Sequence, residues 1–172
     1  MKQKGNKLYN VLFPIWMLAL FPQTWIIVLP ANFLIDLCVM WLALKYIKVA
    51  ELKETIKSTI LKVWIAGFTA DFIGGFAMFS ANLIDVDYQT AFGKWWYHQL
   101  SSPVMYNPFE TVYAFLWTTM CVVLSSLFIY VLNKKWCLKA SNLTDNQKHK
   151  LSLALAIFTA PYLFYLPSEW FW

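Results

Sequence analysis

The stretch from Lys62 to Ser80 constrains the fold more than any other part of the sequence. It reads KVWIAGFTADFIGGFAMFS, and it is long and apolar enough to cross a bilayer as a helix, which takes about 20 residues. At helical spacing it carries small residues four positions apart, which let a neighbouring helix approach closely. We therefore predict a transmembrane helix with a tight packing surface, formed by Ala66, Gly67, Ala70, Gly74 and Gly75.

The composition extends this interpretation to the whole chain. Of the 172 residues, 60% are hydrophobic and 13% are charged, and the mean hydropathy is +0.52. A soluble domain is about 45–50% apolar and about 25% charged. The apolar residues form long blocks between short lysine-rich segments, which is typical of membrane proteins. We predict an all-α, polytopic integral membrane protein with a single domain over residues 1–172, whose spans cover about 8–22, 25–44, 62–80, 108–132 and 151–166.

The topology of the first span has two solutions. Residues 8–44 are too long for one ordinary span and short for two, and Pro22 marks the best position for a turn. If residues 8–21 cross, the lysines before them share the cytoplasmic side with those of the loop after Leu44, as the positive-inside rule favours. We therefore expect five crossings of the plasma membrane, with the N-terminus in the cytoplasm and the C-terminus outside. The alternative is a first segment that lies along the surface, which leaves four spans.

Two polar segments also have helical periodicity. Residues 47–61 carry an apolar stripe that predicts either an amphipathic helix on the inner surface or a continuation of the next span. Residues 81–107 carry aromatic side chains at helical spacing, which indicates an interfacial helix on the outer side. A second interpretation of this aromatic face is a lid over a substrate entrance. The predicted interfacial aromatic residues are Trp95, Trp96, Trp170 and Trp172.

Local signals predict where the last two spans begin and bend. Asn107 precedes proline and, three positions on, glutamate, an order that favours a helix start at that asparagine. Thr144 and Gln147 have the spacing of a capping box. Pro161 predicts a kink in the last span, because proline cannot donate the backbone hydrogen bond that a helix interior requires.

The candidate functional site consists of polar residues at the middle of two predicted spans. Asp36 lies near the middle of the second span, and Asn32 lies one turn earlier on the same face. Asp71 lies near the middle of the third span. Ionisable side chains at this depth are costly, so they face protein or a wet cavity and mark binding or proton pathways. The alternative is structural, with each carboxyl hydrogen-bonded inside a helix contact.

Three functions remain compatible with the sequence. The first is a transporter or channel-type protein whose site at Asn32, Asp36 and Asp71 takes a proton, a cation or a small solute. The second is an accessory or scaffold subunit of a membrane complex, or a homo-oligomer, docked through the small residues. The third is an intramembrane enzyme, for which no nucleophile motif is present. We expect no cofactor, metal or nucleic-acid partner, since the cysteines and histidines have no ligand spacing and the lysines cluster at span ends.

Overall fold

The computed structural model describes residues 25–168, and its regular structure over that range is helical, which confirms the all-α prediction. The predicted span 8–22 lies outside the described residues, as do Trp170 and Trp172. The elements in chain order are α1 (Trp25–Tyr46), α2 (Leu52–Leu83), α3 (Ala91–Trp96), the π-helix η3 (Tyr97–Ser101), α4 (Ser102–Tyr106), α5 (Val112–Leu132), the π-helix η4 (Asn133–Cys137), α6 (Asp145–Phe158) and the 3-10 helix η5 (Tyr162–Tyr165).

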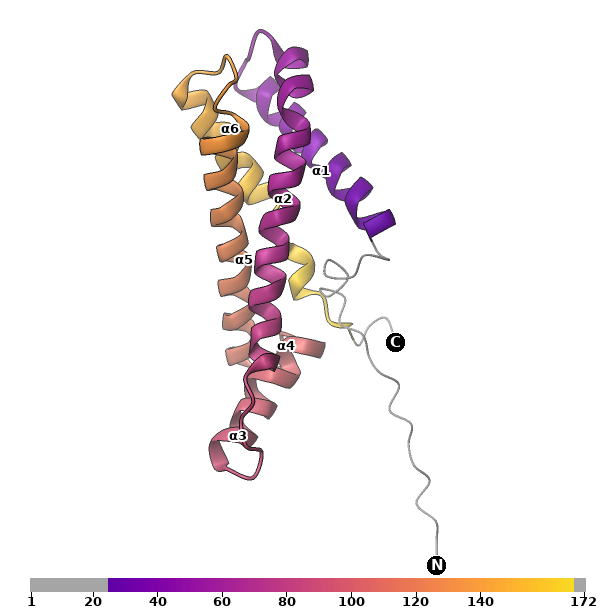
Figure 1. The fold of residues 1–172 in the computed structure, drawn as a ribbon, viewed down its shortest axis with the longest axis vertical. Coiled ribbons are helices and arrows are strands. Elements are labelled where there is room, and N and C mark those ends of the chain that lie inside the picture. Colours follow the sequence, from indigo (N-terminus) through magenta and orange to yellow (C-terminus); the bar gives the residue numbers. More distant parts are fainter. Residues whose placement is uncertain (1–24, 169–172) are drawn as a thin grey trace, which may run out of the picture.

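Helix α2 is the axis of the molecule. It runs alongside α5 for most of its length, while α1 packs against it at one end and then diverges from it (Figure 1). Helix α6 packs against α5 and α1. Three segments are long and apolar enough to cross a membrane, namely α1, α2 and the continuous helix Val112–Cys137. This helix composition is that of a multi-pass membrane protein.

The predicted span 62–80 is too short for the helix that forms there. Helix α2 begins at Leu52, so residues 52–61 continue the span and do not form a separate surface helix. The reason is that Ile56 and Ile60 pack against the same hydrophobic core as the span itself. With 32 residues, α2 is about 48 Å long at 1.5 Å per residue, which exceeds the hydrocarbon thickness of about 30 Å. Its polar first turns therefore extend beyond the apolar layer.

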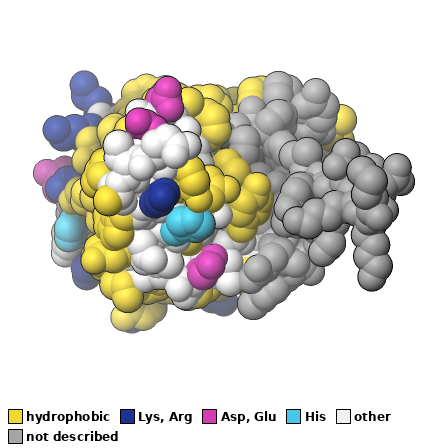
Figure 2. All heavy atoms as spheres, turned by 90° about the horizontal axis from the view of Figure 1, so that it is seen from below, with side chains coloured by type: hydrophobic (Ala, Val, Ile, Leu, Met, Phe, Trp, Pro, Cys, Tyr) yellow, Lys and Arg dark blue, Asp and Glu magenta, His cyan; other side chains and the backbone are white. Residues whose placement is uncertain are grey.

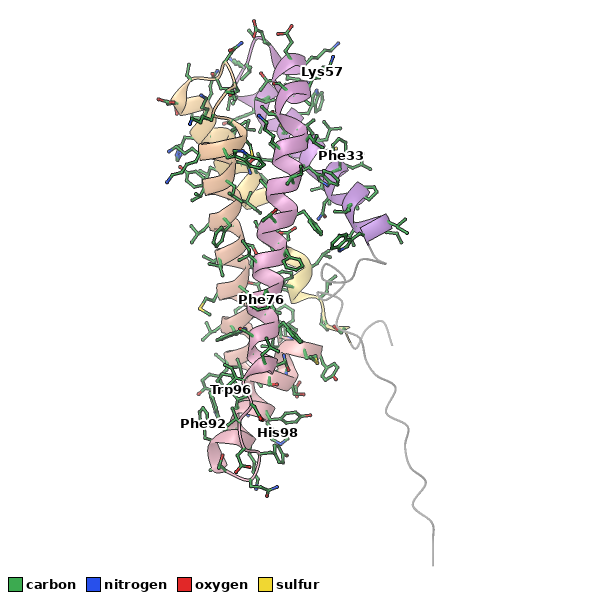
Figure 3. The ribbon with its side chains drawn as sticks, viewed as in Figure 1. Phe33, Lys57, Phe76, Phe92, Trp96 and His98 are labelled. Carbon is green, nitrogen blue, oxygen red and sulfur yellow. The ribbon has the colours of Figure 1, made fainter. Side chains whose placement is uncertain are left out.

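The two ends of the molecule differ in charge and chemistry. Lys57 lies near one end, whereas Phe92, Trp96 and His98 lie near the other (Figure 3). The loop before α2 and the loop before α6 meet at the lysine-rich end, where the Asn142 amide donates a 3.3 Å hydrogen bond to Glu51. Figure 2 looks onto the α3 end, where acidic, histidine and lysine side chains lie in a largely hydrophobic and uncharged surface. This difference is the one that the positive-inside rule uses to orient a membrane protein.

The start of α5 is not where the sequence signal placed it. The N-cap is Thr111, whose hydroxyl accepts a 3.2 Å hydrogen bond from the Ala114 backbone, and it is not Asn107. The Asn107 side chain instead accepts from the backbone of Phe109, two residues on, which forms a local turn. By contrast, the capping box of Thr144 and Gln147 is confirmed at the start of α6.

The last predicted span, 151–166, is a broken segment. Helix α6 ends at Phe158, the chain turns through residues 159–161, and η5 follows. Pro161 has no N–H for the Ile157 carbonyl, and the Tyr162 hydroxyl donates to that carbonyl at 2.6 Å. Ser168 then reaches α4, where its hydroxyl donates to the Met105 carbonyl at 3.4 Å. The segment therefore extends from the lysine-rich end as far as α4, with its break in between.

Candidate functional site

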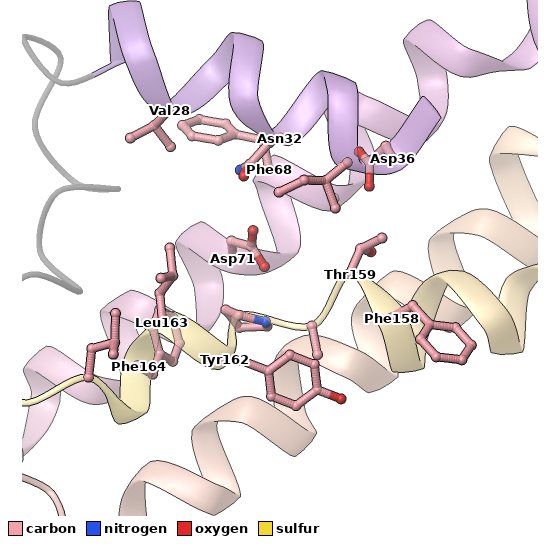
Figure 4. A pocket seen from close by; sticks show the side chains of 15 residues that line it. Val28, Asn32, Asp36, Phe68, Asp71, Phe158, Thr159, Tyr162, Leu163 and Phe164 are labelled. Atoms are coloured by element: carbon pink, nitrogen blue, oxygen red, sulfur yellow. The ribbon is translucent and has the colours of Figure 1, made fainter. Parts of the chain in front are cut away.

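A cavity of about 450 Å³ lies between α1, α2 and the chain that follows α6 (Figure 4). Its volume is within the range of roughly 300–1,000 Å³ found for small-molecule sites. The three polar residues predicted from the sequence all line this cavity. They are Asn32 and Asp36 from α1 and Asp71 from α2. Segments far apart in the chain thus meet around these side chains.

Asp36 is held against the backbone of α2. Its side chain is only 5% exposed. A Cβ atom placed on Gly67 would lie 3.3 Å from one Asp36 carboxyl oxygen, so the missing side chain of that glycine makes room for the carboxyl. Thr159, from the break after α6, lines the same cavity, and its hydroxyl donates a 2.8 Å hydrogen bond to the Leu155 carbonyl. Asp36 therefore lies where α1 meets the backbone of α2.

Asp71 lies one turn after Gly67 on the same face of α2. Side chains on a helix lean towards its N-terminus, so the Asp71 carboxyl leans towards the position where Asp36 meets Gly67. Positions four apart on a helix are separated by on the order of 6 Å, so Asp71 follows Gly67 along the side of α2 that lines the cavity. The Asp71 Oδ1 atom is enclosed and has no hydrogen-bond partner among the described residues. Its hydrogen bonding is therefore incomplete within residues 25–168.

The rest of the cavity wall is mostly apolar, and it was not predicted from the sequence. Aromatic residues at the cavity come from α2, from the end of α6 and from η5, and they are Phe68, Phe158, Tyr162 and Phe164. In Figure 4 the Phe158 ring points away from the two aspartates. Thr159 was missed as well. The sequence signal for this wall was Pro161, which predicted a bend in the last span. It did not indicate which segments the bent chain would pack against.

At helical spacing the small residues of α2 form two ridges, which are Ala66, Ala70 and Gly74 on one side and Gly67 and Gly75, with Asp71 between them, on the other. The two ridges face different neighbours. Gly67 faces α1, as described above. On the other ridge, the Ser125 hydroxyl of α5 donates a 3.0 Å hydrogen bond to the Ala70 carbonyl, and a Cβ atom on Gly74 would overlap the same Ser125 oxygen. Ala66, Gly67, Ala70, Gly74 and Gly75 are all buried within this chain.

The aromatic residues of α3 lie away from the cavity, at the far end of the molecule (Figure 1). The Trp96 indole donates to the Ala81 carbonyl of α2 at 3.1 Å, and Trp95 is 37% exposed and packs edge-on against Tyr113. No α3 residue lines the cavity formed by the described residues. The lid interpretation therefore has no support at this cavity.

The fold and cavity together define a class of protein, namely a small multi-pass helical membrane protein with an acidic cavity between its helices. In comparisons with known proteins, the chain matches no family model, no curated protein and no solved structure.

Proposed function

We propose that this protein is of the transporter or channel type, and that its cavity takes a proton, a cation or a small solute at Asn32, Asp36 and Asp71. One observation carries the proposal. Two carboxyl residues and an amide from different helices line a single cavity, and among the described residues no lysine or histidine lines it with them. The cavity is therefore electronegative whenever either carboxyl is ionised.

The cost of such an arrangement supports a functional role. A carboxyl group inside a membrane domain is unfavourable, and such residues commonly mark ion or proton paths. If Asp71 served only to join helices, a hydrogen-bond partner should accompany it, yet its Oδ1 atom has none among the described residues. The incomplete hydrogen bonding of Asp71 therefore argues against a purely structural role.

The break after α6 supports the same proposal. Transporters commonly form their sites where a helix is interrupted near the middle of the membrane, because freed backbone groups can then line a cavity. Here the interruption at residues 159–161 lies in the wall of the cavity, opposite α1 and α2. A continuous helix would not bring Thr159 and Tyr162 to the cavity in this way.

The scaffold alternative receives less support. The small residues that would dock a partner helix are buried against α1 and α5 of the same chain. They are therefore not available as a free docking surface.

The proposal is tested by measuring charge movement in proteoliposomes under imposed gradients of protons, sodium or potassium, for wild type, Asp71→Asn and Asp71→Leu. Asparagine keeps the size and hydrogen bonding of aspartate but cannot titrate or carry a negative charge. We expect Asp71→Asn to lose most of the activity while its melting temperature stays near that of wild type. Asp87→Asn, in the loop after α2, is the matched control and should remain active. An Asp71→Asn protein with full activity would contradict the proposal.

A further inference from the structure

The cavity has two chemically different walls. Its polar wall is formed by Asn32, Asp36, Asp71 and Thr159. The wall around it is formed by aromatic rings and by aliphatic side chains such as Ile35 and Leu163. We propose that this cavity binds an organic ammonium ion, whose cationic nitrogen lies at the two carboxyls and whose apolar body lies against the rings. This inference rests on the proposed function of the same cavity and names its ligand class.

The charge of the lining selects for a cation. Carboxylates only accept hydrogen bonds, and the Asn32 amide is the sole side-chain N–H group among the cavity-lining residues that the structure describes. An anionic ligand would lie against two carboxyl groups without a balancing lysine or histidine. An ammonium group supplies both a positive charge and the N–H or polarised C–H donors that carboxylate oxygens accept.

The shape and chemistry of the lining favour an organic cation over a metal ion. Hard metal ions such as Ca²⁺ take about six to eight oxygen ligands around one point. The described residues contain no group of three or more His, Cys, Asp or Glu side chains that could hold a metal. A volume of about 450 Å³ also far exceeds what a single ion fills. Most of that space is bordered by carbon atoms, which suit an apolar ligand body.

The aromatic rings are placed to contribute to binding. Phe68 lies one residue after Gly67 and lines the cavity, and its ring is fixed by an edge-to-face contact with Trp25 at 5.3 Å between centroids. Phe164 is only 2% exposed and borders the same space. A cation within about 6 Å of such a ring face is attracted by the ring quadrupole. Carboxyl groups and aromatic rings together thus suit a ligand whose cationic nitrogen carries apolar substituents.

The test is calorimetric titration of the purified full-length protein in mild detergent. The probes are choline, tetraethylammonium and phenylethylammonium. The neutral control is 3,3-dimethylbutanol, which has the shape of choline with carbon in place of the charged nitrogen. Sodium and potassium chloride serve as inorganic competitors. We expect at least one of the three organic cations to bind, the neutral 3,3-dimethylbutanol not to bind, and neither salt to displace the bound cation beyond the effect of ionic strength.

Two substitutions connect binding to this cavity. Asp71→Asn should weaken the affinity for the bound cation about tenfold or more, because a charge-assisted hydrogen bond is lost. Phe68→Leu keeps an apolar side chain but removes the ring face, and it should weaken the affinity about threefold. Phe76→Leu is the matched control on the same helix, since Phe76 is exposed and does not line the cavity, and it should bind as wild type does.

The inference is overturned if none of the three organic cations binds, if 3,3-dimethylbutanol binds as tightly as choline, or if Asp71→Asn binds unchanged. These results differ from a failure of the proposed function. If the wild-type protein moves no charge, or if its charge movement does not depend on Asp71, the transport proposal fails even where an organic cation still binds. Charge movement that depends on Asp71, without binding of any organic cation, would keep the transport proposal and exclude this ligand class.

Discussion

At the residue scale, the most informative positions are glycines that stand where another side chain needs space. Gly67 leaves room for the Asp36 carboxyl, and Gly74 leaves room for Ser125. Sequence reasoning placed both glycines on packing ridges, and it placed Asp36 and Asp71 at similar depth. It could not assign each ridge to a neighbour, because the side of α2 that meets α1 or α5 depends on the rotation of the whole helix.

We predict that Gly74→Ala destabilises the protein through Ser125. The added Cβ atom overlaps the Ser125 hydroxyl, which cannot turn away without giving up its hydrogen bond to the Ala70 carbonyl. Overpacking of this kind costs typically about 1–3 kcal/mol, although alanine regains up to about 1 kcal/mol in helix propensity. Melting curves in detergent should show a lower melting temperature for Gly74→Ala than for wild type.

The control is the same substitution in a Ser125→Ala background, which removes the overlapping oxygen. There Gly74→Ala should lower the melting temperature much less, since the two residues interact directly and their effects are not additive. Equal losses in both backgrounds would contradict the contact between Gly74 and Ser125.

At the scale of elements, the broken segment α6–η5 shows both the strength and the limit of sequence reasoning. The capping box at Thr144 and the bend at Pro161 follow from local chemistry, so they could be predicted. The cap at Thr111 was missed because asparagine, proline and glutamate just before it form an equally good local signal. Two alternatives stayed open for residues 47–61, a separate surface helix or a continuation of the next span. The choice depends on packing against residues that are distant in the sequence.

We predict that Tyr162→Phe destabilises the protein because it leaves the Ile157 carbonyl without a donor. The Tyr162 hydroxyl bonds to that carbonyl at 2.6 Å, in place of the N–H that Pro161 lacks. An unpaired carbonyl in apolar surroundings costs about 1–3 kcal/mol. The melting temperature in detergent should fall accordingly, whereas Tyr46→Phe, at a side chain that is 86% exposed, should leave it unchanged.

A second variant identifies the cause. Pro161→Ala supplies a backbone N–H that can donate to Ile157, so the combination of Pro161→Ala and Tyr162→Phe should be less destabilised than Tyr162→Phe alone. If Pro161→Ala brings no recovery, the hydroxyl does not act as the substitute donor.

At the scale of the whole molecule, composition alone predicted a helical membrane protein, and the three long apolar helices agree. The meeting of α1, α2 and the chain after α6 around one cavity was not predictable. Asp36 and Asp71 could be expected to approach each other, but the third wall comes from residues 158–166, which follow both of them by about half of the chain or more. The orientation, with the lysine-rich end in the cytoplasm, remains a prediction from the positive-inside rule.

The central claim is that water and cations reach an electronegative cavity beside Asp36 and Asp71. It is tested most directly at Ile35, which lines the cavity and is 48% exposed, by Ile35→Cys in a Cys38→Ser background. The measurement is the rate at which a cationic and an anionic methanethiosulfonate modify this cysteine, each divided by its rate with a free thiol in water. Met120→Cys, at an exposed position of α5 outside the cavity, is the control.

We expect Ile35→Cys to react faster than Met120→Cys and to favour the cationic reagent on the order of tenfold, since clefts of one charge concentrate ions of the opposite sign. Replacing both Asp36 and Asp71 by asparagine should bring that preference towards one. A cysteine at position 35 that reacts no faster than the one at position 120, or a preference that survives the loss of both carboxyls, would contradict the account.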